Sequence, residues 1–576
     1  MRVWAPTGEV ELLLPTEAWY GPDTPVRRVE MSREGQWVTA PDLPAGTDYG
    51  FSVDGSPLRP DPRSAAQPYG VHGPSRVFDT AAIDWSDENW AGVDGRGALI
   101  YELHVGTFTP QGTFASAIER LDYLADLGVQ LIELMPIAPF PGNRGWGYDG
   151  VSWTAVHEAY GGPAGLAAFV NAAHRAGMGV CLDVVYNHLG PDGNYLGAFG
   201  PYFTDRHTTP WGSALNFDGE GSEYVRAHLI DAALRWLRDF HVDALRLDAI
   251  HAMIDDSPYH ILAELSDRVA ELEVELDRPL TLIAESDLND PKVVTPTAKG
   301  GWGMDMQWAD DVHHALHTFF TGEAHGYFAD FDSEDALEKV MSKVFFHDGT
   351  ISTFRGQPWG APVPAEIDGH AFVVYDANHD QIGNRAQGDR PAEHLDRTEL
   401  AAQLALVLLS PFTPMIFQGE EWGSRDRFAF FSEHADELGK AVSKGRIKEF
   451  STHGWEEIYG DTFDVPDPQA EETFTASKLT WEAKDNDPEF SSFIRALIEI
   501  RASVECFASP DRTASSLERS ETGLVLHRGA GRVIVNFSEQ PAQHPLGTLL
   551  SSFGEVNSAE TLTVGPRSIA VVINEG

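Results

Sequence analysis

From about residue 99, the chain alternates short apolar runs with longer stretches in which apolar residues recur every three to four positions. Short apolar runs predict buried parallel strands, and the longer stretches predict helices that cover them. Parallel strands joined by helices form either an open doubly wound sheet or a closed barrel. The predicted strands are 99–105, 131–137, 180–186, 244–249, 282–285, 304–308, 372–375 and 415–417.

Eight predicted strands favour the closed alternative, a (β/α)8 barrel, over the doubly wound sheet. The doubly wound sheet would be supported by a glycine-rich phosphate loop after the first strand, and the sequence has none there. Helices are predicted at 114–127, 166–176, 224–240 and 261–276. The fold class is therefore predicted to be α/β.

The two ends of the chain are β-rich and do not share this alternation. Short strand signals separated by Pro, Gly and Asp clusters predict an N-terminal β-sandwich over residues 1–90 and a C-terminal β-sandwich over 501–576. The catalytic barrel with its insertions is predicted to occupy 91–500. Within it, residues 422–480 are rich in acidic and aromatic residues and are predicted to be irregular.

The formal net charge of −47, from 88 acidic and 41 basic residues, argues against nucleic acid and anionic membranes as partners. An uncharged sugar is not repelled by such a surface. The two cysteines are far apart in the sequence, and no run of metal ligands is evident, so we expect neither a disulfide framework nor a metal or other cofactor. The absence of a signal-peptide pattern and of a long apolar span predicts a cytoplasmic protein. The oligomeric state is left open.

Polar clusters stand at the ends of four predicted strands. The carboxyl ends of barrel strands carry the active sites of this fold. Any one cluster could be a structural ion pair, but four at equivalent positions favour a functional site. The clusters are Asp183-Val184-Val185-Tyr186-Asn187-His188, Arg246-Leu247-Asp248-Ala249-Ile250-His251, Glu285-Ser286-Asp287 and Asn378-His379-Asp380-Gln381.

Two carboxylates that face one bond are what glycoside hydrolysis requires. Asp248 and Glu285 end neighbouring strands, and strands about 4.8 Å apart can bring two carboxylates to the spacing of a retaining enzyme. Arg246 shares a strand face with Asp248 and is the expected partner that keeps the nucleophile ionised. Glu285, as the acid, should have a pKa raised by burial and by nearby negative charge.

The four clusters, in this order, resemble the conserved regions of the α-amylase family, glycoside hydrolase family 13. That resemblance implies a retaining mechanism with Asp248 as nucleophile, Glu285 as general acid/base and Asp380 as the third carboxylate, which stabilises the transition state. Arg246 is implied to orient the nucleophile, and Tyr148 to stack on the sugar. The resemblance further implies that His188 and His379 bind the sugar and that Asp183 and Asn187 support the site.

Further stretches resemble the maltooligosyltrehalose trehalohydrolases, among them Tyr101-Glu102-Leu103-His104-Val105-Gly106-Thr107-Phe108-Thr109 and Gln307-Trp308-Ala309-Asp310-Asp311-Val312-His313-His314. This resemblance implies cleavage of the α-1,4 bond next to a terminal trehalose unit. Val312 departs from the usual aromatic residue of that motif, and Gln418 from the expected methionine. The implied groove residues, beyond those already named, are His251, Asp310, Asp311, His313, His314, Gln381 and Asn384.

Two other functions remain open. A 1,4-α-glucan branching enzyme or another α-amylase-family glucanase would share the four clusters and the covalent intermediate, and would differ in what reacts with that intermediate. A catalytically inactive barrel that binds glycans belongs to a different class, and the survival of all three carboxylates argues against it.

Overall fold

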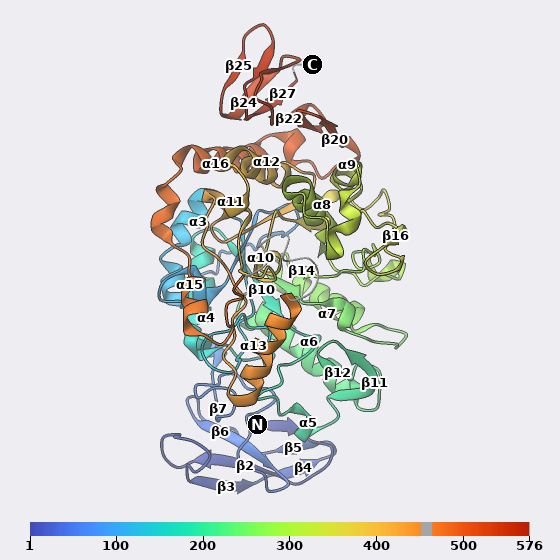
Figure 1. Ribbon diagram of the computed structural model, residues 1–576. Helices are drawn as coiled ribbons and strands as arrows, with labels where there is room; N and C mark the ends of the chain where they lie inside the picture. The colour runs from blue at the N-terminus through green and yellow to red at the C-terminus, as the bar shows by residue number, and fades with distance from the viewer. Residues whose placement is uncertain (451–462, 575–576) are drawn as a thin grey trace.

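The computed structural model describes residues 1–450 and 463–574, and its centre is a closed barrel of eight parallel strands (Figure 1). The strands neighbour one another in the order β10, β13, β14, β15, β18, β19, β8, β9. The predicted barrel is thereby confirmed. The barrel strands are β8 (Ile100–Leu103), β9 (Leu131–Leu134), β10 (Gly179–Val184), β13 (Ala244–Leu247), β14 (Thr281–Ala284), β15 (Met306–Trp308), β18 (Phe372–Val374) and β19 (Thr413–Phe417).

The side chains inside the barrel change character from one end to the other. The lower layers are apolar and form a separate buried cluster that includes Ile100, Cys181 and Met415. Two residues further along their strands, Glu102 and Asp183 point to the same interior and are also buried. Because buried charges need partners, the polar network of the protein concentrates at the carboxyl ends of the strands.

Helices cover the outside of the barrel, with one interruption. Between β14 and β15 the chain forms only a short 3-10 turn, η4 (Thr297–Lys299), and no α-helix. Elsewhere the cover consists mainly of α3 (Leu121–Leu127), α4 (Gly162–Arg175), α6 (Ser222–Asp239), α7 (Ile261–Leu276), α8 (Asp310–Thr321), α12 (Arg397–Leu408) and α16 (Pro488–Ser503).

The N-terminal sheets pack on the barrel through aromatic and ionic contacts. The Trp4 ring stacks on Tyr224 of α6 with ring centroids 5.0 Å apart, and Arg63 pairs with Asp231 at 2.8 Å. One sheet has the order β1 (Arg2–Trp4), β5 (Trp37–Thr39), β4 (Ser32–Glu34), and the other β3 (Val26–Glu30), β2 (Val10–Pro15), β6 (Asp48–Val53), β7 (Ser75–Arg76).

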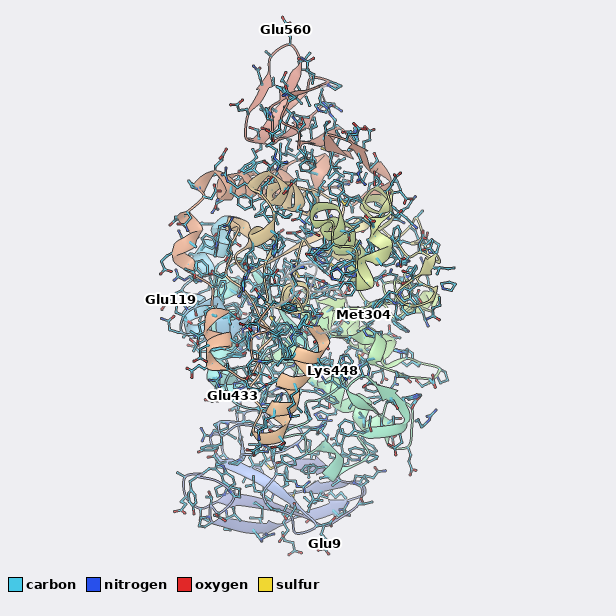
Figure 2. All side chains as sticks on the ribbon, in the orientation of Figure 1. Glu9, Glu119, Met304, Glu433, Lys448 and Glu560 are labelled. Carbon is cyan, nitrogen blue, oxygen red and sulfur yellow. The ribbon has the colours of Figure 1, made fainter. Side chains whose placement is uncertain are left out.

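The C-terminal sheets lie at the opposite end of the molecule, as the positions of Glu9 and Glu560 in Figure 2 show. Phe553 packs on Phe493 of α16 with centroids 5.5 Å apart, which holds these sheets against the barrel. Strands lie near residues 524, 533 and 569, within the segment that the sequence predicts to be β-rich. The larger sheet consists of β20 (Ser515–Ser520), β21 (Gly523–Arg528), β22 (Gly531–Asn536), β27 (Ser568–Ile573) and β24 (Thr548–Phe553), and the smaller of β23 (Ala542–His544), β26 (Leu562–Val564) and β25 (Val556–Ser558).

Two predictions made from the sequence are wrong, one about a helix and one about an irregular region. The single helix predicted over 114–127 is divided into α2 (Phe114–Ile118) and α3, and Arg120, between them, places its guanidinium 4.5 Å from the centre of the Trp481 ring. That cation–π contact, unrelated to the apolar periodicity, accompanies the break. The region 422–480 is not irregular throughout, because it contains the 15-residue helix α13 (Asp436–Phe450). Its part at 451–462 lies outside the described residues.

In the described ranges, every helix is too short or too polar to cross a lipid bilayer.

Candidate active site

Asp248 and Glu285 follow two neighbouring strands of the barrel, β13 and β14. The residue after Asp248, Ala249, has a left-handed backbone with φ of 40°. Such a conformation is unfavourable for a residue with a Cβ, and it is maintained where the surroundings require it. Here it turns the chain so that the Ala249 N–H donates a hydrogen bond to Glu285 Oε2. The backbone after one carboxylate thus holds the other.

Arg246 is the cation around which the carboxylates gather. Its Nη1 lies 2.7 Å from Asp183 Oδ2 and 3.0 Å from Asp248 Oδ1, and its Nη2 lies 3.8 Å from Glu285 Oε2. The guanidinium also stacks over the Trp308 ring, 4.1 Å from its centre. Burial by itself would lower the pKa of Arg246, but these carboxylates outweigh burial and raise it well above its usual value. Arg246 therefore stays charged inside the barrel.

The Glu285 carboxyl has a raised pKa. Burial raises the pKa of its carboxyl well above the usual value, and the neighbouring Asp248 adds to this effect while Arg246 opposes it. The Oε2 atom accepts the Ala249 N–H, and the Glu285 side chain lines a cavity together with Asp248. Asn187 Nδ2 donates to Asp248 Oδ2 at 2.9 Å, and so fixes the other carboxylate.

A chain of hydrogen bonds runs from β8 across the mouth of the barrel. Glu102 accepts both the backbone N–H and the Nδ1 of His379. Burial lowers the pKa of the His379 imidazole, but Glu102 more than compensates, so the pKa is raised. His379 Nε2 lies 2.7 Å from Tyr148 Oη, which donates to Asp183 Oδ2 at 2.6 Å. Each member of the chain is thereby oriented by the next, and the chain ends at a carboxylate that Arg246 also binds.

Asp380 lies in the first turn of the short helix α10 (His379–Gly383). The N-cap residue Asn378 accepts the backbone N–H groups of Asp380 and Gln381 through its side chain, which anchors the start of this helix. At the end of the helix, Asn384 Nδ2 donates to Asp380 Oδ1 at 2.8 Å. The third carboxylate is therefore held from both its backbone and its side chain.

His188 faces the same cavity and is covered by an aromatic ring. Its Nδ1 bonds the side chain of Asn187, and its Nε2 lies 3.1 Å from the carbonyl oxygen of Tyr148. The Trp211 ring stacks on the imidazole with centroids 4.6 Å apart and planes within 4°. Burial lowers the pKa of His188, which favours the neutral ring. Trp211 is 49% exposed and lines the same cavity as His188.

Two cavities meet at Asp380 and Asn384, which line both. The larger has a volume of about 570 Å³ and the smaller about 210 Å³. Besides these two residues, the larger is lined by Trp146, Tyr148, His188, Trp211, Asp248, Ala249, His251, Glu285, His379, Phe430, Val442, Gly445, Arg446 and Glu449. The smaller is lined by Asp287, Asn289, Asp310, Asp311, His314, Tyr327, Phe331, Phe354, Arg355 and Gln381.

The residues predicted from the 310–314 motif divide into two groups. Asp310 and His314 face the smaller cavity, and burial raises the pKa of Asp310 to about 6. Asp311 also lines it, but its Oδ2 accepts Asn289 Nδ2 at 2.9 Å and the Phe346 N–H at 2.7 Å. His313 is buried and bonds the carbonyl oxygen of Asp376, and it lines neither of the two cavities.

Sequence reasoning did not assign a role to several residues of the site. Glu102 could have been found, because a charged residue inside an apolar strand is the signal that identified Arg246. Trp211 lies in the turn of a small hairpin between Pro210 and Gly212, where an aromatic side chain has little core to join. No sequence pattern identified Arg446 as a site residue, since it lies on helix α13, which the sequence did not predict.

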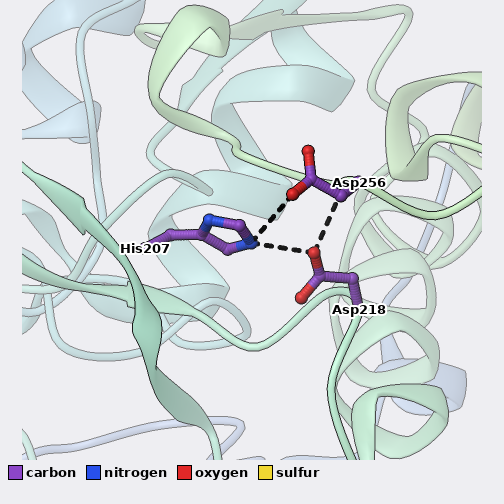
Figure 3. Close-up of side chains that lie close together, drawn as sticks. All are labelled: His207, Asp218 and Asp256. Carbon is purple, nitrogen blue, oxygen red and sulfur yellow. Dashed lines mark hydrogen bonds and ion pairs between the residues drawn. The ribbon is translucent and has the colours of Figure 1, made fainter.

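One cluster among the described residues has the composition of a metal site: His207, Asp218 and Asp256 (Figure 3). His207 Nε2 lies 2.8 Å from Asp218 Oδ2, and Arg206 Nη1 lies 3.0 Å from Asp218 Oδ1. Asp256 is 69% exposed at its side chain and also donates its backbone N–H to Asp218. These ion pairs account for the cluster, which fastens the hairpin of β11 (Phe203–Thr209) and β12 (Gly212–Leu215) that carries Trp211.

Comparison with known proteins agrees with this geometry. Residues 76–199 match the family model for the alpha amylase catalytic domain. The malto-oligosyltrehalose trehalohydrolase of Arthrobacter ramosus is 49% identical over 91% of this chain and 90% of its own length. The chain belongs to the malto-oligosyltrehalose trehalohydrolase family. Its relatives include the enzyme of that name from Saccharolobus solfataricus, 45% identical over 82% of this chain and 81% of its own length.

A solved structure with a similar sequence also has a similar fold. The crystal structure of a Salmonella typhimurium protein described provisionally as an alpha amylase matches with a TM-score of 0.89 and 35% identity, and covers 100% of this chain and 97% of that one. The protein is therefore a glycoside hydrolase of the α-amylase family, and its substrate is an oligosaccharide.

Proposed function

We propose that the protein hydrolyses the α-1,4-glucosidic bond next to the terminal trehalose of maltooligosyltrehalose and releases trehalose with retention of configuration. The observation that carries this proposal is the pair of carboxylates, Asp248 and Glu285, on neighbouring strand ends around one guanidinium. The choice of substrate rests on the family to which the chain belongs.

In the proposed first step, Asp248 attacks the anomeric carbon while Glu285 gives its proton to the departing glycosidic oxygen. A covalent glucosyl–Asp248 ester forms, and trehalose leaves with that proton. In the second step Glu285, now ionised, takes a proton from a water molecule that attacks the same carbon and releases the glucan. Asp380 is proposed to stabilise the oxocarbenium-like transition states through sugar hydroxyls.

We assign the glucan to the larger cavity and the trehalose unit to the smaller. Tyr148, His188 and His379 line the larger cavity together with Asp248, which supports placing the cleaved glucose on their side. The leaving group departs from the side of the acid, and Asp310, whose charge affects the pKa of Glu285, belongs to the smaller cavity. The groove roles of His251, Asp311, His314 and the other predicted residues are part of this proposal. For His313, which faces neither cavity, we propose indirect support through Asp376.

Product analysis tests the proposal. Purified protein is incubated with maltooligosyltrehalose and, separately, with the maltooligosaccharide of equal length. We expect free trehalose from the first and little change in the second, and the new reducing end should first be observed by NMR as the α anomer. Chain transfer or cleavage on the plain maltooligosaccharide would instead indicate a branching enzyme or an amylase, and no reaction with either would support an inactive glycan-binding barrel.

Other sequence-based statements stay predictions. They are the absence of a cofactor or metal, the absence of nucleic-acid and membrane partners, the cytoplasmic location and the domain boundaries at 90/91 and 500/501.

A further inference from the structure

Helix α13 forms one wall of the larger cavity, although it belongs to an insertion after the last barrel strand. It crosses in front of the barrel in Figure 1, and Lys448 near its end is labelled in Figure 2. Val442, Gly445, Arg446 and Glu449 of this helix line the cavity together with Asp380. The helix therefore lies beside the catalytic carboxylates without supplying one of them.

Arg446 connects α13 to the end of α10. It is 8% exposed, and its Nη2 donates to the carbonyl oxygens of Gly383 and, at 3.4 Å, of Arg385. Its Nη1 lies 3.5 Å from Asn384 Oδ1 and 3.2 Å from Glu449 Oε2. One guanidinium thus contacts three consecutive residues at the end of α10. The contacts are to atoms that can only accept, which suits a group with five donors and no acceptor.

The chemistry of the neighbours decides the orientation of the Asn384 amide. Arg446 can only donate, so the atom facing it must be the oxygen, Oδ1. The oxygen of Asp380 that faces the amide is an acceptor, so the atom opposite it is the nitrogen, and Nδ2 donates to Asp380 Oδ1 at 2.8 Å. An amide turned the other way would oppose two donors at one end and two acceptors at the other. Arg446 and Asp380 are therefore joined through one amide with a single favourable orientation.

Two aromatic rings hold the guanidinium in its place. The Arg446 Cζ lies 4.5 Å from the centre of the Phe450 ring and 5.4 Å from that of Phe430, and Phe430 also lines the cavity. A planar guanidinium can stack on such rings and still donate in its own plane, which a lysine ammonium cannot do. The guanidinium is therefore held both by these rings and by its hydrogen-bond acceptors.

We propose that Arg446 is a positioning residue for the third carboxylate: through Asn384 and the carbonyls at the end of α10, it fixes the orientation of Asp380 in the larger cavity. The inference rests on the proposed function, because it takes Asp380 as the group that stabilises the transition state. A carboxylate whose benefit arises mainly in the transition state should affect kcat when it is displaced, and affect substrate binding much less. A displacement of about 1 Å can cost about 100-fold in rate.

The test compares Arg446→Met, Arg446→Lys, Asn384→Ala and the double variant Arg446→Met/Asn384→Ala, assayed for trehalose release. Lys440→Met is the matched control, because Lys440 lies on the same helix, is 66% exposed at its side chain and pairs with the exposed Glu437 at 2.8 Å. For Arg446→Met we expect kcat to fall about 10- to 100-fold, with KM changed less than about threefold. Asn384→Ala should lower kcat by a similar factor and, because Asn384 lines both cavities, should also raise KM. Arg446→Lys should recover only part of the rate.

The double variant separates positioning from general stability. If Arg446 acts through Asn384, the loss in kcat should be about that of the larger single loss and not the product of the two. A kcat for Arg446→Met within twofold of that for Lys440→Met, a loss confined to KM, or fully multiplicative losses would overturn the proposal. If Arg446→Met does not fold, Arg446→Lys, which keeps the charge and the stem, decides by the same criteria. Failure of the wild-type protein to release trehalose would refute the proposed function instead.

Discussion

Replacing Glu285 with glutamine should remove the acid and leave the fold in place. The amide oxygen of glutamine can accept the Ala249 N–H as Glu285 Oε2 does, so the local structure has no reason to change. The proton for the leaving oxygen is lost. General acid catalysis typically contributes about 10²–10⁴ in rate, or about 3–5 kcal/mol of transition-state stabilisation, and we expect kcat/KM on maltooligosyltrehalose to fall by that factor.

The leaving group provides the decisive assay. A maltooligosyl fluoride loses fluoride without protonation, so formation of the covalent intermediate from it needs no acid. Pre-steady-state release of fluoride by Glu285→Gln should therefore remain within about tenfold of the wild-type rate. Glu271→Gln, an exposed change on α7, is the matched control. An equal loss on the fluoride and on the natural substrate would refute the acid role of Glu285.

The same substitution should stabilise the protein, and increasingly so as the pH rises. The folded pKa of Glu285 is raised above its ordinary value of 4.5, so the native state binds the proton more tightly than the unfolded state. Below pH 4.5 the raised pKa leaves the free energy of unfolding unchanged. Above that pH it lowers the free energy of unfolding of the wild type by about 1.4 kcal/mol for each pH unit, up to the folded pKa. Glutamine does not titrate, so the free energy of unfolding of the variant lacks this pH-dependent loss. The Tm of the variant should exceed that of the wild type by more at about pH 7 than at about pH 5, and a constant difference would contradict the raised pKa.

Three further substitutions test neighbouring roles. Asp248→Ala should lower kcat by about 10⁴-fold or more with unchanged Tm, and azide should partly restore the rate as an external nucleophile; full activity would exclude Asp248 as the nucleophile. Asp380→Asn should lower kcat far more than it raises KM, and an unchanged kcat would exclude its role in the transition state. Trp211→Ala should raise KM about tenfold for long substrates, from the loss of roughly 1–2 kcal/mol of apolar contact, and an unchanged KM would place the glucan elsewhere.

The sequence was sufficient to predict the barrel and the identity of its polar strand ends. Buried parallel strands read as continuous apolar runs, and a charge in such a run is visible because burial makes it costly. Arg246 and Asp248 were found in this way, and Glu285 was predicted from its place at the end of the next strand. Both patterns are local in the sequence, so they can be recognised without knowing which strands are neighbours. The roles of the three carboxylates were implied by resemblance, and they remain proposals.

Only the tertiary structure decided how these groups depend on one another. The contact of Ala249 with Glu285 joins residues 36 positions apart, and that of Arg446 with Asn384 joins residues 62 apart. The break at Arg120 is accompanied by a contact with Trp481, more than 300 positions away. Helix α13 was missed because few of its residues are buried, so its sequence carries little apolar periodicity. Periodicity records which face of an element is buried, whereas hydrogen bonds between distant loops depend on a closed barrel that brings those loops to one end.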